Sequence, residues 1–340
     1  MKAFVLAAGV GTRLRPLTSE IPKPMVPVLG RPALYHTFMN LKKNGFDDIC
    51  ANLHYCPNAV TDYFSNAGLG VKLTFSFEKK LLGTAGAVKK NESFFDGTFV
   101  VMSGDGLSDV NLKEALAFHK KNKSAATIVL KKIDTRFEYG ITLTDKRGKV
   151  KKFVEKPLWG DVFANTVNTG IYILEPEIFK YIPKNKFFDF GADLFPLLLK
   201  NKKNIFGYVT RQYWTDIGNI YEYKKGVFDA LNGKVKIGIS GVKSGQNYIS
   251  QSAKIDKSVK IHAPCFIGDN AIIGKNSVLA PYCVISNNVI VSDNCEIDKS
   301  IIWENSKINK NTKIHNTIVG YAAEIPAAIT LFDSIFMEQK

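Results

Sequence analysis

The last third of the chain carries a six-residue repeat, which restricts the fold of this region more than any other sequence feature does. An aliphatic residue recurs every six positions from Ile249 to Ile297, and a five-residue step to Ile302 precedes two further repeats that end at Ile314. A small or β-branched residue follows each aliphatic position four residues later. A hexapeptide period is typical of a parallel β-helix, whose stacked coils bury the aliphatic column. We therefore expect residues 249–320 to form a left-handed parallel β-helix.

The corners and inner positions of this repeat have suitable residues. Asn and Asp tolerate left-handed backbone angles, and pairs of them separate the strands. These pairs are Asp269-Asn270, Asn287-Asn288 and Asp293-Asn294. Three of the five cysteines occupy the small inward position, where we expect them to pack rather than react. They are Cys265, Cys283 and Cys295.

We expect the β-helix to build an assembly rather than to catalyse. His262 and His315 lie inside the repeat and would be candidates for acyl transfer, but about four coils without an inserted loop leave little room for an acyl donor. We interpret both histidines as surface turn residues. The tail at 321–340 is rich in apolar residues, which we expect to cap the last coil or contact a neighbouring subunit. We therefore predict a homo-oligomer formed through the β-helix.

Residues 1–232 show short apolar stretches that alternate with amphipathic ones. Strand candidates lie at 4–7, 49–53, 73–77, 99–102 and 127–130. A helix is expected over 33–43, because Pro32 precedes it and Gly45 follows it. Strands alternating with helices indicate an α/β fold, here a Rossmann-like, mostly parallel sheet covered on both faces. The glycine-rich segment 233–248 is then a linker between this domain and the β-helix.

Composition excludes several classes of partner and site. The formal net charge is +15, but only six of the 46 basic residues are arginines, and no segment combines them with base-stacking residues. We expect no nucleic-acid partner. Five cysteines without a CxxC pair argue against disulfides and a structural zinc site. The chain has no run of 18 apolar residues and no secretory pattern at its start, so we expect a cytoplasmic protein without a membrane partner.

The first strand candidate leads into a glycine-rich run with two arginines. Gly9 and Gly11 let backbone amides approach a phosphate closely, and Arg13 and Arg15 can clamp phosphate oxygens bidentately. The run is no dinucleotide fingerprint, because Leu14 stands in the place of the third glycine. It is also no Walker A loop, since no Gly-Lys-Ser/Thr follows.

This run, Gly9-Val10-Gly11-Thr12-Arg13-Leu14-Arg15-Pro16-Leu17-Thr18, together with Pro22-Lys23-Pro24-Met25, resembles the signature of the sugar-1-phosphate nucleotidylyltransferases. The resemblance extends through Gly83-Thr84-Ala85-Gly86, Gly104-Asp105, Glu155-Lys156-Pro157, Asn168-Thr169-Gly170 and Trp214-Thr215-Asp216-Ile217-Gly218. It implies an enzyme that joins a nucleoside triphosphate to a sugar-1-phosphate with Mg²⁺ and releases pyrophosphate. The run 216–219, the linker start at 233–235 and the β-helix are most similar to bacterial mannose-1-phosphate guanylyltransferases.

The resemblance also implies a role for individual residues. Such a reaction gathers several negative charges, so positioning and charge neutralisation carry the catalysis without a protein nucleophile. The catalytic candidates are Arg13, Lys23, Asp105 and Asp216, and the two aspartates are the Mg²⁺ candidates. The nucleotide-binding candidates are Leu6, Ala8, Gly9, Gly11, Thr12, Arg13, Glu78, Gly83 and Asp105. The candidates for the sugar and its phosphate are Tyr139, Gly140, Glu155, Lys156, Asn168 and Gly170.

The choice of base rests on Glu78. One carboxylate can accept both N1–H and N2–H of guanine, whereas uracil and thymine suit an amide better. This favours GTP, and with it mannose-1-phosphate as the acceptor. An ordinary surface glutamate paired with Lys79 or Lys80 is the alternative reading.

Other activities stay open. The same chemistry would serve a heptose-1-phosphate guanylyltransferase, or a uridylyl- or thymidylyltransferase acting on glucose-1-phosphate. A catalytically silent regulatory subunit that binds sugar nucleotides is a candidate of another class. The intact Arg13, Lys23, Asp105 and Asp216 argue against a silent subunit, because such a copy is free to lose them.

Overall fold

The computed structural model describes residues 1–133, 139–155 and 164–338. The chain divides into two compact units. The first comprises Met1–Val10, Ile21–Met25 and Leu34–Asp216, and the second Gly11–Glu20, Val26–Ala33 and Ile217–Lys340. Two short N-terminal segments therefore group with the C-terminal part of the chain. Among the described residues, no helix is long and apolar enough to cross a membrane.

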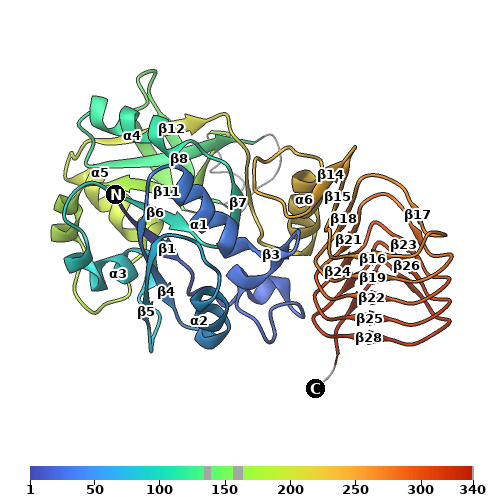
Figure 1. Ribbon diagram of the computed structural model, residues 1–340. Helices are drawn as coiled ribbons and strands as arrows, with labels where there is room; N and C mark the ends of the chain where they lie inside the picture. Colours follow the sequence, from blue (N-terminus) through green and yellow to red (C-terminus); the bar gives the residue numbers. More distant parts are fainter. Residues whose placement is uncertain (134–138, 156–163, 339–340) are drawn as a thin grey trace. The chain divides into compact units, whose positions relative to one another are not determined.

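A mixed α/β sheet forms the centre of the first unit (Figure 1). Over the described residues its strands run in the order β10-β9-β11-β6-β1-β4-β5, and β8 and β12 extend it beside β11. The strands are β1 (Lys2–Leu6), β4 (Asp48–Leu53), β5 (Lys72–Phe77), β6 (Phe99–Ser103), β8 (Ala126–Lys132), β9 (Ile141–Thr144), β10 (Val150–Val154), β11 (Thr166–Leu174) and β12 (Ile205–Thr210). The pairs β1–β4, β1–β6, β4–β5 and β8–β12 are parallel, while β11 is antiparallel to its neighbours. This confirms the predicted α/β sheet.

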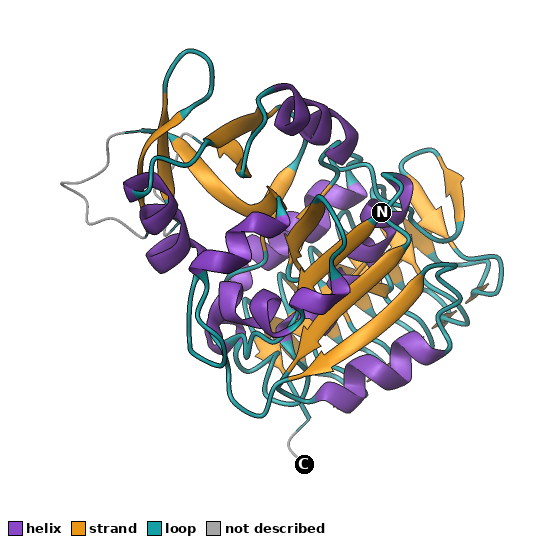
Figure 2. Ribbon diagram, turned by 90° about the vertical axis from the view of Figure 1, so that its left-hand side faces the viewer, coloured by secondary structure: helices purple, strands orange, loops and turns teal. Residues whose placement is uncertain are grey.

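Helices cover both faces of this sheet (Figure 2). Side chains alternate along β1, so that Phe4 enters one apolar core with α3 and α5, while Ala3 and Val5 enter the other with α1, α2 and α4. The helices are α1 (Ala33–Lys43), α2 (Pro57–Ser65), α3 (Gly83–Lys90), α4 (Leu112–Lys121) and α5 (Phe195–Lys200). Further helical turns among the described residues of this unit are Lys23–Met25, Glu92–Phe94, Pro176–Tyr181 and Phe190–Leu194. Successive side chains of a strand point to opposite faces of the sheet, so the strands supply apolar residues to both cores.

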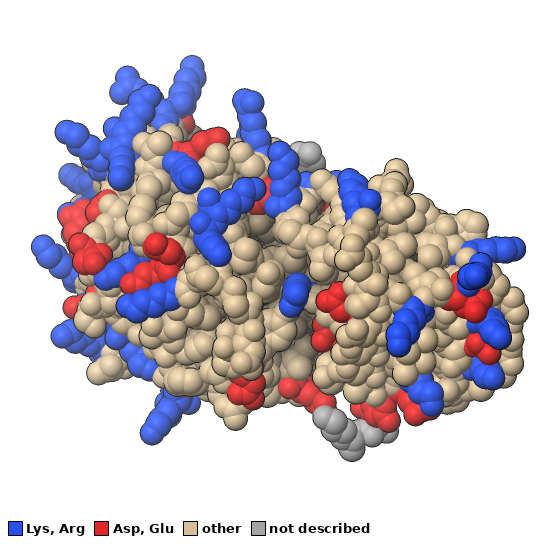
Figure 3. Space-filling view, viewed as in Figure 1, with Lys and Arg blue, Asp and Glu red and all other residues tan. Residues whose placement is uncertain are grey.

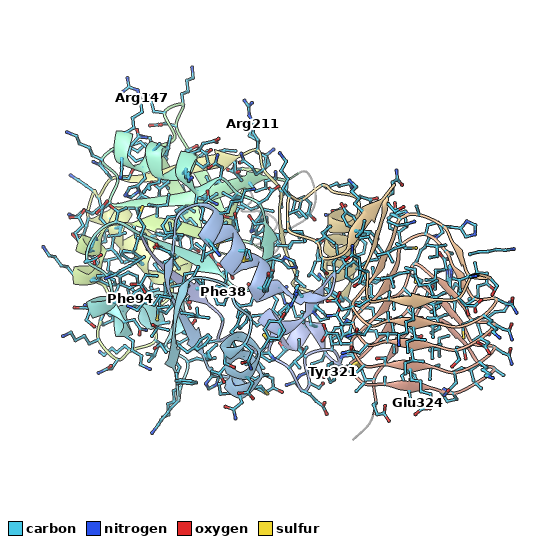
Figure 4. The ribbon with its side chains drawn as sticks, viewed as in Figure 1. Phe38, Phe94, Arg147, Arg211, Tyr321 and Glu324 are labelled. Atoms are coloured by element: carbon cyan, nitrogen blue, oxygen red, sulfur yellow. The ribbon has the colours of Figure 1, made fainter. Side chains whose placement is uncertain are left out.

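Helix α1 spans the residues expected for it. Gly45 ends it with a φ of 86°, and Phe46 N–H donates to the carbonyl of Leu41 at 3.0 Å, which closes a Schellman-type cap. Phe38 points from α1 into the core (Figure 4). A glycine is required here because the cap needs a left-handed residue.

A two-stranded antiparallel sheet lies beside the main one within the first unit. It joins β7 (Gly106–Ser108) to β13 (Trp214–Asp216), with Asp216 opposite Gly106. The pairing brings the end of β13 next to the turn that follows β6. Two carboxylates far apart in the sequence thereby become neighbours.

The second unit is a parallel β-helix with a helix and a hairpin packed in the same unit. Its three strand columns are β15-β18-β21-β24-β27-β30, β16-β19-β22-β25-β28 and β17-β20-β23-β26-β29 in the described residues, and each pair of successive strands is parallel. The first column comprises β15 (Asn247–Ile249), β18 (Cys265–Ile267), β21 (Cys283–Ile285), β24 (Ile301–Ile302), β27 (Ile318–Val319) and β30 (Ile335–Phe336). The second comprises β16 (Lys254–Ile255), β19 (Ile272–Ile273), β22 (Ile290–Val291), β25 (Lys307–Ile308) and β28 (Glu324–Ile325). The third comprises β17 (Lys260–Ile261), β20 (Val278–Leu279), β23 (Glu296–Asp298), β26 (Lys313–His315) and β29 (Thr330–Phe332).

The registers of these columns confirm the predicted hexapeptide β-helix. Ile267 pairs with Ile285 eighteen positions on, but Ile285 pairs with Ile302 and Ile302 with Val319, each after 17 positions. The five-residue step seen once in the sequence therefore recurs in every later coil. The coils continue beyond residue 320. The apolar tail residues Ile325, Leu331 and Phe336 lie on β28, β29 and β30, and they extend the three columns. At the other end, β14 (Val242–Ser244) pairs antiparallel with β15, inside the segment expected to be a linker.

Asparagines form ladders along the corners of the coils. Asn270, Asn288 and Asn294 have φ between 55° and 57°, as predicted for the turns. Asn270 Nδ2 donates to Asn288 Oδ1 at 3.3 Å, and Asn288 Nδ2 donates to Asn305 Oδ1 at 3.0 Å. At these positions a left-handed residue and an amide contact to the next coil occur together.

The cysteines of the repeat pack in the interior as predicted, but His315 lies half-buried on strand β26 and not in a surface turn as expected. Cys265, Cys283 and Cys295 are buried in the coil interior. His262 is exposed. His315 Nδ1 lies 2.6 Å from Asp298 Oδ2, and its ring stacks on Phe332.

Helix α6 (Ile220–Leu231) and the hairpin β2 (Pro27–Val28) and β3 (Arg31–Pro32) pack on the coils within the second unit. Buried Trp303 donates from Nε1 to the hydroxyl of Tyr223 at 2.9 Å, and that hydroxyl donates to the carbonyl of Pro27 at 2.8 Å. At the hairpin tip, a Cβ on Gly30 would come within 3.0 Å of Phe266. The coil thus fixes both the helix and the hairpin.

Charge is distributed unevenly over the surface. On the face shown in Figure 3, Lys and Arg side chains crowd the edge formed by α4 and β12, whereas those of the coils are spaced among Asp and Glu. Arg147 and Arg211 project outward from that edge (Figure 4). On the coils, Glu324 instead pairs with Lys307 at 2.8 Å.

Candidate active site

One lysine and two aspartates meet in the first unit. Lys23 Nζ lies 2.6 Å from Asp105 Oδ2 and 2.8 Å from Asp216 Oδ1. Lys23 is 8% exposed, so solvent screens this cluster little. Lys23 therefore contacts both of the predicted catalytic aspartates directly.

Local backbone geometry positions the two aspartates of this cluster. Asp105 follows β6 and the buried Gly104, where a Cβ would come within 3.0 Å of Leu34 and Val5. Asp216 ends β13 opposite Gly106. The carboxyl end of a central strand is where open α/β sheets place their ligands.

Charge explains the protonation state of this cluster. Burial alone would raise the pKa of Asp105, but the Lys23 ammonium and hydrogen bonds from Lys23 and Ser103 hold that pKa below its ordinary value. Burial alone would lower the pKa of Lys23, yet the charges of Asp105 and Asp216 raise it well above its ordinary value. Lys23 and Asp105 are therefore both ionised at neutral pH.

The glycine-rich run is divided between the two units. Gly9 is exposed after β1, and a Cβ there would meet nothing within 4 Å, so its backbone is open to a ligand. Gly11, with a φ of 71°, precedes the 3₁₀ turn Thr12–Leu14 in the second unit, where Thr12 and Arg13 are exposed. Thr18 Oγ1 donates to the carbonyl of Gly11 at 2.7 Å. The role of Arg13 stays a prediction.

Glu78 is buried and belongs to a network at the ends of three strands. Its Oε1 accepts from Asn52 Nδ2 at 2.8 Å, and its Oε2 accepts from the backbone N–H of Leu82 at 3.0 Å. Asn52 in turn accepts from the N–H of Ala7 at 2.9 Å. Glu78 is thus no ordinary surface glutamate, although its contact with a base stays a prediction.

Two other nucleotide candidates are fixed by close packing. Gly83 begins α3 with a φ of 73°, and a Cβ there would lie 2.7 Å from the carbonyl of Phe188. Leu6 pairs with Asn52 on one side and Ser103 on the other. Leu6 therefore joins the strand end of the Glu78 network to that of Asp105.

The sugar candidates form a second group along β11. Gly170 sits at a bulge with a φ of 71°, so any side chain there would be strained, and its Cβ would lie 3.2 Å from Ser103. Its N–H donates to Asn168 Oδ1 at 3.0 Å. Ser103 donates to Asp105. The bulge thus brings Asn168 and Gly170 beside the aspartate cluster.

Glu155 lies in a cradle made by two glycines. A Cβ on Gly140 would come within 2.6 Å of Glu155 Oε2, and one on Gly191 within 2.2 Å. The N–H of Asn168 donates to the carbonyl of Gly140 at 2.8 Å. Any side chain at either glycine would displace this carboxylate. Lys156, the candidate for the sugar phosphate, lies outside the described residues.

Trp214 ties the sugar candidates to Asp216. Its Nε1 donates to the carbonyl of Thr169 at 2.9 Å, and its ring packs edge-on against Tyr139 with centroids 5.3 Å apart. Trp214 stands two residues before Asp216 on β13. Sequence reasoning gave this tryptophan no role, although it belongs to a quoted motif.

The sequence profile described as "Nucleotidyl transferase" matches residues 2–232, which include these clusters. The chain belongs to the nucleotidyl transferase family. A second profile, "GMPPB C-terminal domain", matches residues 243–340 of this nucleotidyl transferase.

The names of relatives of this nucleotidyl transferase describe enzymes that act on sugar-1-phosphates. The UTP--glucose-1-phosphate uridylyltransferase of Synechocystis sp. is 35% identical over 304 residues, which cover 79% of this chain and 78% of that protein. The probable mannose-1-phosphate guanylyltransferase 2 of Arabidopsis thaliana is 33% identical over 278 residues, with 79% and 75% covered. The crystal structure of HddC from Yersinia pseudotuberculosis complexed with GMP-PN matches with a TM-score of 0.59 and 29% identity, covering 67% of this chain and 99% of that one. The protein is a sugar-1-phosphate nucleotidyltransferase.

Some residues of the nucleotidyl transferase site escaped sequence reasoning. Asn52 and Ser103 both stand at strand ends, which is the available signal, but neither lies in a recognisable motif. Tyr172 accepts from Asn168 Nδ2 at 2.9 Å, and burial raises the pKa of its hydroxyl. In the sequence, nothing distinguishes Tyr172 from any other aromatic residue of a strand.

Proposed function

We propose that this protein transfers a guanylyl group from GTP to mannose-1-phosphate, forming GDP-mannose and pyrophosphate. The observation that carries the reaction type is the contact of Lys23 with Asp105 and Asp216 in a chain of the nucleotidyl transferase family. The guanylyltransferase relatives and the "GMPPB C-terminal domain" profile support the choice of GTP and mannose-1-phosphate.

In this reaction an oxygen of the sugar phosphate attacks the α-phosphorus of the triphosphate. The bond to the bridging oxygen breaks, and pyrophosphate leaves with the electron pair. Lys23 neutralises charge on the α- and β-phosphates. From their motif alone, Gly9, Gly11 and Arg13 hold the rest of the triphosphate.

Asp105 and Asp216 are the residues that would hold Mg²⁺. Their chemistry fits that ion, because Mg²⁺ prefers one or two carboxylates with waters and substrate phosphates over a closed protein cage. Across the described residues, no group of three or more His, Cys, Asp or Glu is placed to bind a metal. Bound there, Mg²⁺ would neutralise phosphate charge and orient the reacting groups.

Sugar recognition is proposed for the group along β11. The Glu155 carboxylate can accept from two adjacent hydroxyls of a pyranose, and the Asn168 amide offers a donor and an acceptor. Gly140 and Gly191 leave room for this carboxylate, because a Cβ on either would collide with it. A fixed acceptor discriminates better between sugars that differ in one hydroxyl.

A second candidate substrate pair is UTP with glucose-1-phosphate. It is favoured by the Synechocystis relative, which is 35% identical. Under this alternative, Glu78 would brace the strand ends without reading the base. The reaction and the other residue roles would be the same.

A substrate screen tests the proposal. Purified protein with Mg²⁺ is offered GTP, UTP, dTTP and ATP against mannose-, glucose- and heptose-1-phosphates, and pyrophosphate release is measured. The expected optimum is GTP with mannose-1-phosphate. A preference for UTP and glucose-1-phosphate would replace it with the second candidate. Sugar-nucleotide binding without any pyrophosphate release would indicate a silent subunit.

A further inference from the structure

The ammonium of Lys23 stands where a metal bound to both aspartates would stand. It contacts one oxygen of Asp105 and one of Asp216, at 2.6 and 2.8 Å. Two carboxylates this close repel each other unless a cation lies between them. In this structure Lys23 is that cation.

The backbone of Lys23 is fixed, so only its side chain can leave this position. Lys23 lies between Pro22 and Pro24, all three are buried, and the N–H of Met25 donates to the carbonyl of Pro22 at 2.8 Å. Proline fixes its own φ and restricts the residue before it. The side chain itself has four rotatable bonds, which let the ammonium turn to a nearby anion.

A divalent cation that binds the same two carboxylate oxygens must displace the ammonium. The displaced ammonium would then be a largely buried charge without its counter-ions, which is unfavourable. A triphosphate removes this penalty, because its oxygens supply the new counter-ions. Metal and nucleotide binding are therefore coupled, and the coupling is reciprocal.

We propose that Lys23 occupies the metal position in the free protein and releases it only when a nucleoside triphosphate arrives. Metal and nucleotide then bind as one event, and neither binds tightly alone. This inference rests on the proposed metal role of the two aspartates. It adds a positioning role for Lys23 before the reaction begins.

Direct measurement of Mn²⁺ binding tests the proposal without turnover. Free Mn²⁺ is followed by electron paramagnetic resonance, with and without a GTP analogue whose α,β-methylene bridge prevents pyrophosphate release. The wild-type protein is expected to bind Mn²⁺ weakly alone and about tenfold or more tightly with the analogue, within the usual range of coupling.

Lys23→Met removes the charge and keeps the length of the side chain. It is expected to bind Mn²⁺ without nucleotide about tenfold more tightly than the wild type, with little further gain from the analogue. Lys23→Gln is a second variant, with circular dichroism as the check of folding for both. Lys257→Met removes an exposed lysine from a turn of the β-helix and should bind Mn²⁺ like the wild type.

A double variant tests whether the gain in Mn²⁺ affinity arises at the two aspartates. Adding Asp216→Asn to Lys23→Met should abolish the gain in Mn²⁺ affinity. The proposal is overturned if folded Lys23→Met and Lys23→Gln bind Mn²⁺ no more tightly than the wild type, or if the gain survives Asp216→Asn. The substrate screen reports separately on the proposed function, because Mn²⁺ binding requires neither the right base nor the right sugar.

Discussion

Residues that act together are spaced very differently in the β-helix and in the sheet of the first unit. In the β-helix, contacting amides such as Asn270 and Asn288 are 18 positions apart. In the first unit, Lys23 and Asp216 are 193 positions apart. A coil residue therefore depends on its neighbouring coils, whereas the active-site cluster depends on the whole unit being folded.

The two regions also use polar side chains for different purposes. Those of the coils satisfy turns and the next coil, and the interior is filled by aliphatic columns. In the first unit, Asp105 and Asp216 stand next to strand ends, where their carboxylates come close enough to share Lys23. Substitutions in the coils should therefore change stability, and substitutions at the strand ends should change chemistry.

The largest effect is expected at the aspartates. Asp105→Asn and Asp216→Asn should each lower kcat by about three orders of magnitude, because a lost carboxylate removes several kcal/mol of charge stabilisation at the reacting phosphates. Pyrophosphate release at saturating Mg²⁺ measures this, with thermal unfolding as the check of folding. Asp333→Asn, an exposed turn residue of the last coil, is the matched control and should leave kcat unchanged. Near-normal kcat in either active-site variant would exclude that aspartate as a ligand.

The next effect concerns the coil. Trp303→Ala should lower the free energy of unfolding by about 3–5 kcal/mol, because a buried indole leaves a cavity. Trp303→Phe retains a ring but loses the donor to Tyr223, and should cost about 1 kcal/mol. Chemical denaturation measures both. Turnover per folded molecule should not change, and a marked fall in kcat would show that the coil supports the active site.

Glu78→Gln separates two roles of one residue. The amide cannot accept from both Asn52 and Leu82 at once, so unfolding should become easier by about 1–3 kcal/mol. If Glu78 also reads guanine, kcat/KM should shift from GTP toward UTP. Asn52→Ala is the control, since it breaks the same network without touching the carboxylate. An equal shift in both variants would mean that Glu78 only braces the strand ends.

The smallest effect is expected at a corner of the coil. Asn288 has a φ of 57°, so Asn288→Ala should destabilise by about 1–2 kcal/mol through backbone strain. Asn288→Gly avoids the strain and loses only the amide ladder. Melting temperatures of the two variants, compared with the wild type, separate the contributions. Equal losses would show that the ladder, and not the left-handed turn, stabilises the corner.

The sequence predicts most of the fold because both regions obey local periods. Strands and helix α1 follow from alternation and capping, and the coils follow from the hexad. The extension beyond residue 320 was not predicted, since Val319 stands after a second five-residue step that hides the period. The grouping of Gly11–Glu20 and Val26–Ala33 with the C-terminal part also has no local signal, because it depends on packing such as that of Gly30 on Phe266.

The candidate site was predictable only where motifs mark it. Lys23, Asp105 and Asp216 lie in such motifs, and they meet in the structure. The position of the Lys23 ammonium between the two carboxylates was not predicted, because the spacing of these residues in the sequence does not show which side chains are in contact. Asn52 was missed for a similar reason, as a polar residue at a strand end reads as a turn until its partner is known.

The one-residue shortening of the later coils has a consequence for how such a domain can change in length. Successive coils lose their residue at the same corner, so the three inward columns stay aligned from Ile285 to Phe336. A duplicated segment of 17 residues would therefore add one complete coil, and the β-helix would lengthen by a single strand spacing of about 4.8 Å. Gene duplication or protein engineering could lengthen this region in steps of 17 or 18 residues, the two coil lengths that the columns already contain, whereas an insertion of another size would have to loop out at a corner.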